Sequence, residues 1–358
     1  MTPDIRHWND IDAEWLTAVL QQDGIDAQVA SISKQKVGTG QVGDCVRYTM
    51  EYAGTVPDNA PKTMVGKFRA DAPESRAIGI QLLNYYREVR FYQLLQEKAR
   101  ITTPYCYFTD MIDETHEFVL MMADLAPAEQ GDQLVGVNIA QTEQVLTEAA
   151  KLHGAFWQDD SLDQYHWVGG TSQAESPINP DMLAAIWVAF KERYGERVTP
   201  AAMRIGEGIS QNYERWEKLT EGPKGLMHSD YRPDNMLFDE TGTQPPVTVV
   251  DWQSFNYGGC AADIGYFIAG AITPELRREH EQALQAHYLK AFEAEAGQAY
   301  TPDIFQRHYI MGAYQLFLTA YFAAIMVTQT DRGDDMFFKM LNGAVDLVHD
   351  HDAADWFD

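Results

Sequence analysis

The sequence has few cysteines and lacks an apolar start. Only Cys45, Cys106 and Cys260 occur, an odd number without a Cys-x-x-Cys pair, so neither a disulfide framework nor a zinc site is expected. Residues 1–10 contain no apolar run, so no signal peptide is expected there. These absences favour a reducing compartment, and we expect the protein to be cytoplasmic.

Basic residues are also scarce. The chain has 27 Lys and Arg against 53 Asp and Glu, which gives a net charge of −26. Such a surface repels nucleic acid and anionic membranes, so we expect neither as a partner. The acidic excess could suit a cationic substrate, but a solvated acidic surface that aids solubility is the favoured interpretation.

Only one stretch raises the question of a membrane. Residues 310–327 form 18 positions without a charged residue, which is near the lower limit for a transmembrane helix. Gln315 and Thr319 interrupt the stretch, and the usual basic flanks are missing, so a buried core helix is expected and no membrane insertion. Repeats and low-complexity tracts are also missing. The 358 residues, 45% of them hydrophobic, suffice for two substantial cores.

One stretch combines the residue types that phosphoryl transfer uses. It has the pattern His-x-Asp-x-x-x-x-Asn and then an apolar strand that ends in Asp; the residues are His228, Asp230, Asn235 and Asp251. Phosphoryl transfer needs a base for the attacking hydroxyl and oxygen ligands for the metal ions that bridge the ATP phosphates. We therefore predict Asp230 as the catalytic base, and Asn235 and Asp251 as Mg²⁺ ligands. His228 is predicted to fix the loop. The alternative is a surface turn rich in Asp and Asn with a chance strand behind it.

These residues resemble the aminoglycoside phosphotransferase and choline kinase superfamily, which shares the protein kinase fold, and most of all its bacterial members akin to the ecdysteroid kinases. The resemblance rests on His228-Ser229-Asp230, on Asn235 and on Asp251-Trp252-Gln253. Aminoglycoside kinases usually carry Gly at the position of Ser229. Protein kinases have Asp-Phe-Gly in place of Asp251-Trp252-Gln253, which argues against a protein kinase with a mobile activation segment.

A glycine pattern precedes this stretch at residues 37–43. Gly-x-Gly-x-x-Gly fits both kinases and dinucleotide-binding folds, but residues 45–52 alternate as a strand does, whereas a dinucleotide-binding turn must open a helix. Asp44 follows the last glycine, so the Walker pattern fails. We predict a hairpin loop that covers the nucleotide phosphates with Gly38, Gly40 and Gly43. An ordinary glycine turn is the alternative.

The resemblance implies a lysine and glutamate pair at the nucleotide. Lys67 lies in the middle of a predicted strand at 63–70 and matches the kinase lysine that holds the α- and β-phosphates. Glu88 lies on the apolar face of a predicted helix at 84–99, where a charge needs a partner, and Lys67 is the natural one. A solvated lysine, and Glu97 on the other helix face, are the alternatives.

The resemblance also places the hinge between two lobes. Residues 118–122 form a predicted strand, and backbone groups of Met121, Met122 and Ala123 would meet adenine. Many relatives carry Glu at the position of Ala123. We predict an N-lobe at 1–125 and a C-lobe at 126–358, with no assigned role for residues 131–133.

Three acidic or histidine features receive structural predictions. Asp263 opens an apolar helix at 264–269 and could cap it; in the superfamily the matching Asp ties down the catalytic loop, and we favour a structural role. His153 is a lone histidine on an apolar helix face, for which a satisfied core histidine is favoured. Residues 349–352 have metal-ligand types, but a frayed acidic terminus is favoured.

Other helices are predicted from apolar periodicity and capping residues. A first helix would begin near residue 8 with Asn9 or Asp10 as its cap and end near residue 22. Further helices are predicted in the second half of the chain, at 139–157, 181–193, 200–219, 274–296 and 302–327.

We therefore expect an α+β, protein-kinase-like fold with two lobes, the first an antiparallel sheet with one key helix and the second larger and mainly helical. The expected function is phosphorylation of a small-molecule hydroxyl with ATP and Mg²⁺. Similarity to ecdysteroid kinases points to a neutral or lipophilic alcohol as acceptor; aminoglycoside or choline-type acceptors are alternatives. A protein kinase, a non-catalytic nucleotide-binding protein and a dinucleotide-dependent oxidoreductase are the rival functions. The oligomeric state is left open.

Overall fold

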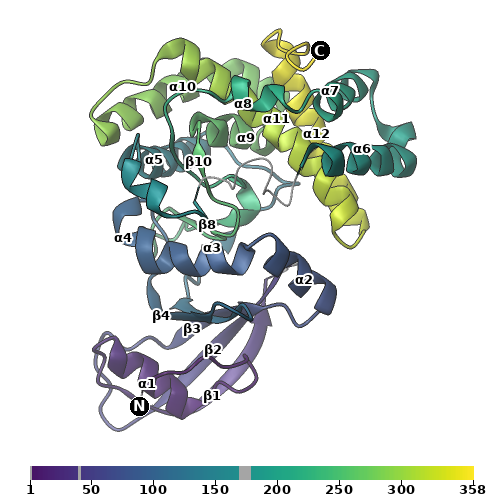
Figure 1. Cartoon of the computed structure of the whole chain (residues 1–358). Helices are drawn as coiled ribbons and strands as arrows, with labels where there is room; N and C mark the ends of the chain where they lie inside the picture. Colours follow the sequence, from purple (N-terminus) through teal and green to yellow (C-terminus); the bar gives the residue numbers. More distant parts are fainter. Residues whose placement is uncertain (1, 39–41, 169–178) are drawn as a thin grey trace. The chain divides into compact units, whose positions relative to one another are not determined.

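A computed structural model describes residues 2–38, 42–168 and 179–358 (Figure 1). The chain divides into two compact units. The first comprises Met1–Glu97, Thr103–Pro127 and Val250–Ser254, and the second comprises Lys98–Thr102, Ala128–Val249 and Phe255–Asp358. An antiparallel sheet in the first unit and a mainly helical second unit confirm the predicted α+β, kinase-like fold. The lobe boundary predicted near Leu125 stays a prediction.

The first unit is built on a five-stranded antiparallel sheet. Its strand order is β1 (Gln28–Val37), β2 (Gly43–Ala53), β3 (Thr63–Arg69), β5 (Glu117–Ala123) and β4 (Cys106–Ile112). The predicted strands at 45–52, 63–70 and 118–122 are therefore confirmed. The helices are α1 (Ala13–Gln22), α2 (Pro73–Gln81), α3 (Asn84–Arg90) and α4 (Gln96–Ala99), with a π-helical segment η1 (Phe91–Leu95) between the last two.

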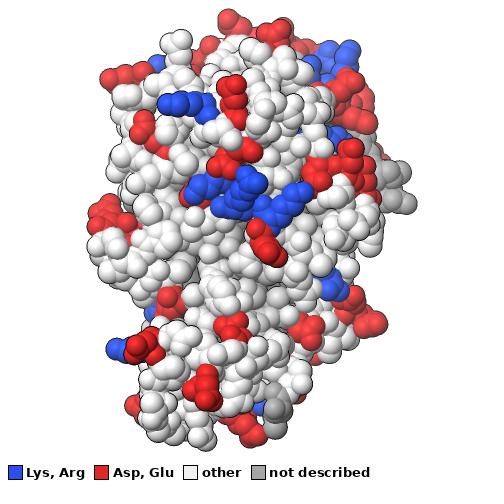
Figure 2. All heavy atoms as spheres, turned by 90° about the vertical axis from the view of Figure 1, so that its left-hand side faces the viewer, with Lys and Arg blue, Asp and Glu red and all other residues white. Residues whose placement is uncertain are grey.

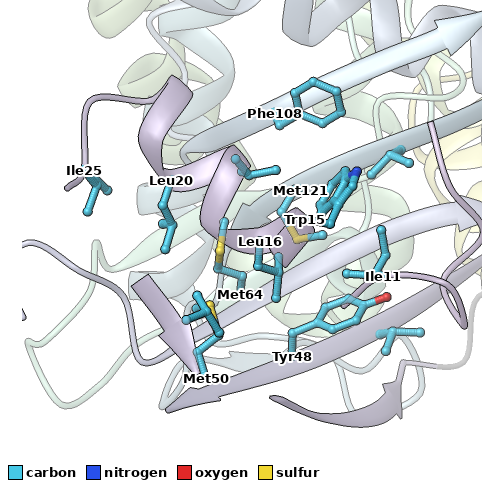
Figure 3. Packing of buried hydrophobic residues seen from close by; sticks show 14 of the residues in the cluster. Ile11, Trp15, Leu16, Leu20, Ile25, Tyr48, Met50, Met64, Phe108 and Met121 are labelled. Atoms are coloured by element: carbon cyan, nitrogen blue, oxygen red, sulfur yellow. The ribbon is translucent and has the colours of Figure 1, made fainter. Parts of the chain in front are cut away.

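Helix α1 packs on one face of this sheet. Figure 3 shows Trp15, Leu16 and Leu20 of α1 against side chains of four strands; those labelled are Tyr48, Met50, Met64, Phe108 and Met121. The prediction that Asn9 or Asp10 caps this helix is wrong. Asp12 is the cap and accepts a hydrogen bond from the Trp15 N–H at 2.8 Å, because the helix begins at Ala13.

Alternation along β3 sends Lys67 to the other face of the sheet. Met64 and Phe68 belong to the core under α1, and successive side chains of a strand point to opposite faces. Lys67 therefore points away from α1. Helix α3 contacts β4 and β5 and presents Glu88 to Lys67. The alternation of side chains along β3 and the helical spacing of α3 therefore turn these two residues toward each other.

The second unit consists of helices around two small sheets. The helices are α5 (Ile139–Ala155), α6 (Pro180–Tyr194), α7 (Pro200–Gln211), α8 (Arg215–Leu219), α9 (Ala261–Ala271), α10 (Pro274–Ala296), α11 (Pro302–Met326) and α12 (Asp331–Asp350), with short 3-10 turns η2 (Asp160–Gln164), η3 (Gly195–Arg197) and η4 (Pro233–Asn235). The sheets pair β7 (Gly225–Met227) with β10 (Asn256–Gly258), and β8 (Met236–Phe238) with β6 (Glu129–Gln130) and β9 (Val247–Val249). The single helix predicted at 200–219 is two, α7 and α8, and α12 was not predicted.

Helix α11 contains the long apolar stretch of the sequence. By length and composition it is the one helix in the described part of the chain that could cross a membrane, yet 61% of its most apolar window is buried inside the protein. It packs on α9, α12 and α6. Added Cβ atoms at Gly265 of α9 and Gly312 of α11 would lie 1.8 and 2.0 Å from backbone oxygens of the other helix. These glycines therefore permit close packing of α9 and α11 in a protein core.

The C-terminal segment is ordered, so the prediction of a frayed terminus is wrong. Helix α12 extends to Asp350, and the ring of His351 lies 3.0 Å from Oε1 of Glu281 and 3.1 Å from Nε2 of Gln306. These contacts fix the end of the chain on α10 and α11.

The charged surface fits the interpretation of a solvated acidic protein. On the face drawn in Figure 2, Asp and Glu side chains occur in small scattered groups rather than in one concentrated patch. Scattered carboxylates favour solubility over recognition of one polycationic ligand on this face.

Candidate functional site

Lys67 and Glu88 form a buried ion pair in the first unit. Nζ of Lys67 lies 2.7 Å from Oε1 of Glu88 and 3.3 Å from Oδ1 of Asp251. Lys67 is 7% exposed and Glu88 is 1% exposed. Burial disfavours the ammonium, but the carboxylates of Asp251 and Glu88 outweigh it and raise the pKa of Lys67. The lysine therefore stays charged. Glu97, the alternative partner, is exposed.

The glycine pattern joins β1 to β2. Gly38 has φ of +76°, which suits glycine. A Cβ at Gly43 would lie 3.1 Å from the Phe68 carbonyl oxygen and 3.4 Å from Cε of Lys67, so a side chain there would crowd the backbone of β3 and contact the lysine. Gly40 lies outside the described residues. Because β2 rather than a helix begins at Gly43, the dinucleotide-binding alternative is contradicted.

The expected adenine-binding residues lie at the end of β5. Met121 and Met122 pair with β3 on one side and β4 on the other. The N–H of Ala123 donates to the Tyr105 carbonyl oxygen at 2.8 Å. That N–H is therefore already bonded, and the adenine contact at Met121, Met122 and Ala123 stays a prediction.

In the second unit, Asp230 is held from three sides. Tyr266 of α9 donates to its Oδ1 at 2.7 Å, and Asn235 Nδ2 donates to its Oδ2 at 2.8 Å. Arg232 Nε lies 3.1 Å from Oδ1 and 3.2 Å from Oδ2. Burial raises the pKa of the carboxyl, but the charge of Arg232 and the Tyr266 hydroxyl outweigh burial and lower it. Asp230 is thus an oriented, ionised carboxylate, the form that accepts a proton.

Asn235 is positioned by the short turn η4. Its amide nitrogen also donates to the backbone oxygen of Asp230 at 2.8 Å. These two hydrogen bonds are donated by the nitrogen, and an amide oxygen is the atom of asparagine that suits a metal ion. The loop therefore presents one carboxylate and one amide oxygen from residues five apart.

Asp263 ties the loop to α9 instead of capping that helix. Its carboxylate accepts hydrogen bonds from the backbone N–H of His228 at 2.6 Å and of Ser229 at 2.9 Å, and the helix begins at Ala261. The predicted cap is therefore wrong, and the contact implied by the superfamily resemblance is present. His228 is fully buried, and its Nδ1 accepts from the Asp230 N–H at 3.3 Å.

Ser229 shows why related enzymes use glycine at this position. Its φ is +68°, in the left-handed region that favours glycine. Its N–H is held by Asp263, and its carbonyl oxygen accepts from Gln315 Nε2 at 2.8 Å. Contacts at both ends of the residue maintain a backbone conformation that serine alone would disfavour.

His153 is a bonded core histidine, as expected. Its Nε2 lies 3.2 Å from Oδ2 of Asp263, and its Nδ1 lies 2.8 Å from the Tyr288 hydroxyl. Burial opposes protonation, but Cys260 and Asp263 outweigh it and raise the pKa of His153 to about 9. The charged ring therefore supports the carboxylate that holds the backbone of His228 and Ser229.

We expect His153 to make stability fall at alkaline pH. Its pKa is about 9 when folded and about 6.5 when unfolded, so its contribution is complete below about pH 6.5 and is lost as the pH rises through about 9. Each pKa unit corresponds to about 1.4 kcal/mol, so the loss should be of the order of 1–3 kcal/mol. Urea unfolding at several pH values measures it. His153→Gln should flatten this dependence, whereas His280→Gln, on the partly exposed side of α10, should not.

The loop at 131–133, unassigned from the sequence, supports the catalytic loop. The Gln133 N–H donates to Oδ1 of Asp234 at 2.8 Å, and its side chain donates to the Gly270 carbonyl oxygen at 2.7 Å. Asp234 in turn accepts from Arg232 at 2.6 Å. Asp132 pairs with Arg332 of α12 at 3.0 Å. This loop therefore links α9 and α12 to Arg232 beside Asp230.

Several residues of this arrangement were not predicted. They are Tyr266, Arg232, Asp234, Gln133, Gln315 and Gln253. Tyr266 lies one helical turn after Asp263, so the i, i+3 spacing could have suggested that both face the same loop. The glutamines carry no comparable signal, because their partners are backbone or side-chain groups distant in sequence.

Within the described ranges, no three His, Cys, Asp or Glu side chains are grouped so as to hold a metal ion. The prediction of Asn235 and Asp251 as magnesium ligands stays a prediction.

The fold and these residues define a class, the kinase-like phosphotransferases of small molecules. The model of the ecdysteroid kinase-like family matches residues 41–299, more than half of the 358-residue chain. The chain belongs to the ecdysteroid kinase-like family. No curated protein matches it in sequence.

Solved structures of low sequence identity share the fold. A candidate aminoglycoside phosphotransferase from Ralstonia eutropha is 17% identical with a TM-score of 0.55, and the alignment covers 97% of this chain and 98% of that one. A microcompartment-associated aminopropanol kinase is 14% identical with a TM-score of 0.53, covering 90% and 94%. Ethanolamine kinase from Plasmodium vivax is 11% identical with a TM-score of 0.52, covering 87% and 81%.

Proposed function

We propose that this protein transfers the γ-phosphoryl group of ATP to a hydroxyl of a small molecule. The observation that carries the proposal is Asp230, an ionised carboxylate held by Tyr266, Arg232 and Asn235. Asp230 would orient the acceptor hydroxyl and accept its proton. General bases of this kind contribute about 10²–10⁴-fold to rate, and most of the remaining catalysis would be positioning and charge stabilisation.

The first unit supplies groups suited to the nucleotide. The Lys67 ammonium, oriented by Glu88, would bind the α- and β-phosphates. Gly38 and Gly43 flank the hairpin loop that would cover the phosphates, and Gly43 avoids a close contact with the Phe68 carbonyl oxygen beside Lys67. Backbone groups of residues 121–123 would meet adenine. Gly40 is proposed for the same loop on sequence alone.

Asn235 and Asp251 are proposed as the protein ligands of magnesium. Both offer oxygen atoms, which magnesium prefers, and the amide nitrogen of Asn235 is engaged by Asp230, which leaves its oxygen for the metal. When bound, the ion would neutralise charge on the phosphates. Asp251 also lies 3.3 Å from the Lys67 ammonium. The carboxylate of Asp251 would bind the metal ion, and the neighbouring ammonium of Lys67 would bind the phosphates.

Loss of either proposed ligand should weaken metal-dependent nucleotide binding. We expect Asp251→Ala and Asn235→Ala each to raise the Kd for Mg-ATP about 10-fold or more, because a charge-assisted ligand is removed. Calorimetric titration with and without magnesium measures this. Asp239→Ala, in the turn after β8, is the control. Wild-type affinity in both ligand variants would place the metal elsewhere.

For the acceptor we propose a neutral, largely apolar alcohol rather than an aminoglycoside. Membership of the ecdysteroid kinase-like family supports this choice. The scattered carboxylates in Figure 2 offer no concentrated cradle for a polycation on that face. Pockets for such ligands are usually apolar with a few polar groups, and the second unit is rich in aromatic residues, most of which are buried.

The acceptor class is tested by direct competition. The protein is incubated with Mg-ATP and a mixture of aminoglycosides, choline, ethanolamine and hydroxysteroids, and products are identified by mass spectrometry. We expect a phosphorylated apolar alcohol. Efficient phosphorylation of aminoglycosides with no product from the apolar alcohols would reverse the acceptor choice and leave the phosphotransferase proposal standing.

A further inference from the structure

Glu88 uses its two carboxylate oxygens for two different partners. Oε1 faces the Lys67 ammonium at 2.7 Å, and Oε2 accepts a hydrogen bond from Nε2 of Gln253 at 3.2 Å. All three residues are buried, with Gln253 5% exposed. A buried carboxylate with one oxygen unsatisfied is unfavourable, so the second bond matters to the position of Glu88.

Gln253 belongs to a three-residue segment, residues 251–253, that contacts the rest of the first unit at three points. Oδ1 of Asp251 lies 3.3 Å from Lys67, the Trp252 ring stacks on Phe91 at 3.8 Å with an interplanar angle of 4°, and Gln253 bonds to Glu88. Asp251 has φ of +68°, a conformation that non-glycine residues rarely adopt. A disfavoured backbone conformation persists where surrounding contacts hold it. The contacts of Asp251, Trp252 and Gln253 with Lys67, Phe91 and Glu88 are of that kind.

The helix that carries Glu88 has a π-helical turn where this segment contacts it. The helix changes from α to π between Arg90 and Phe91. A π-helical turn is wider than an α-helical one and is often found at functional sites. Phe91 is the first residue of that turn and the residue on which Trp252 stacks. The stack therefore fixes the helix one turn after Glu88, while Gln253 fixes Glu88 itself.

The amide of Gln253 is the side chain that this position requires. It donates a hydrogen bond without adding charge, and this bond favours the ionised form of Glu88, which burial opposes. A carboxylate at the same position would place a like charge against Glu88. An apolar side chain of the same length would leave Oε2 without a donor.

We propose that Gln253 is a positioning residue that keeps the Lys67 and Glu88 pair assembled, with the Trp252 and Phe91 stack holding the helix in register. The catalytic consequence rests on the proposed phosphotransferase function, but the structural consequence does not.

The first test needs no nucleotide or acceptor. Amide hydrogen exchange of residues 84–90 is compared between the wild type and Gln253→Met, which keeps length and removes the donor. We expect exchange to be about tenfold faster in the variant, because the loss of one buried hydrogen bond to a charged group destabilises the helix by about that factor. Gln96→Met is the matched control, since the Gln96 side chain donates to Thr103 and Pro104 rather than to Glu88. Unchanged exchange in Gln253→Met, or equal acceleration in both variants, overturns the proposal.

The second test measures positioning through Glu88. In a double-mutant cycle, Gln253→Met should raise the Kd for ATP about tenfold in the wild type and less than about twofold in Glu88→Ala, because it acts only through that carboxylate. In turnover assays the loss should lie in KM for ATP rather than in kcat. Gln253→Glu should bind ATP more weakly than Gln253→Met. Equal losses in both backgrounds would contradict the proposal, whereas absence of phosphotransfer by the wild type would contradict only the proposed function.

Discussion

Asp230→Asn should reduce turnover by about 10²–10⁴-fold, the usual contribution of a general base, and leave ATP affinity within about twofold of the wild type. The reason is that Asp230 belongs to the second unit and is bonded to Tyr266, Arg232 and Asn235, whereas Lys67 and Glu88 form the predicted phosphate site in the first. An asparagine has nearly the same shape but cannot accept the proton. Steady-state kinetics and ATP titration measure the two quantities.

The control for this variant is Asp239→Asn. Asp239 is another carboxylate of the same unit; it is buried and bonded to Thr241 and to the Gln244 N–H in a turn. The Asp239→Asn variant should turn over within about twofold of the wild-type rate. If Asp230→Asn turned over at the wild-type rate, another group would have to be the base, and if it lost ATP affinity to the same extent as turnover, its defect would not be a catalytic one.

Lys67→Ala should lower kcat/KM for ATP by about 10²-fold, because a charged donor in a site of this kind is worth about that much. Glu88→Ala should lower it by about tenfold, because Glu88 acts by orienting Lys67 at 2.7 Å. In the double variant, loss of Glu88 should add less than about twofold, since its partner is already gone.

The controls are Lys62→Ala and Glu97→Ala, which remove exposed residues of the same charge. Additive losses for Lys67→Ala and Glu88→Ala would mean that each residue acts independently, and the ion pair would then have no role in nucleotide use. A loss in the exposed controls would point to the general charge of the protein rather than to this pair.

The elements with a clear repeating pattern could be predicted from the sequence. Alternation at 45–52 predicted β2, and the i, i+3, i+4 pattern around Glu88 placed that residue toward the sheet. Helix α10 was predicted with its observed bounds, and in the structure Thr273 and Pro274 mark its start and Gly297 its end. Helix α12 was overlooked although Thr330 caps it and its apolar face is well formed.

The catalytic loop illustrates what the sequence could not provide. Asp230, Asn235 and Asp263 were found through their spacing and the family resemblance, but their bonding partners are distant in sequence. Gln315 reaches Ser229 across 86 positions and Gln253 reaches Glu88 across 165. A single glutamine has no periodicity or spacing that identifies such a contact, because it depends on how complete helices pack. The same reason left the role of residues 131–133 open.

The proposal that the protein phosphorylates a small-molecule alcohol is tested most directly by one measurement. Wild-type protein and Asp230→Asn are incubated with Mg-ATP and a library of alcohols, and each mixture is searched by mass spectrometry for an acceptor that has gained one phosphoryl group. We predict a phosphorylated alcohol with the wild type and about 10²–10⁴-fold less with Asp230→Asn. Phosphorylated product in equal amounts from both proteins would contradict the role of Asp230, and ATP binding without any phosphorylated acceptor across the library would contradict the proposed function.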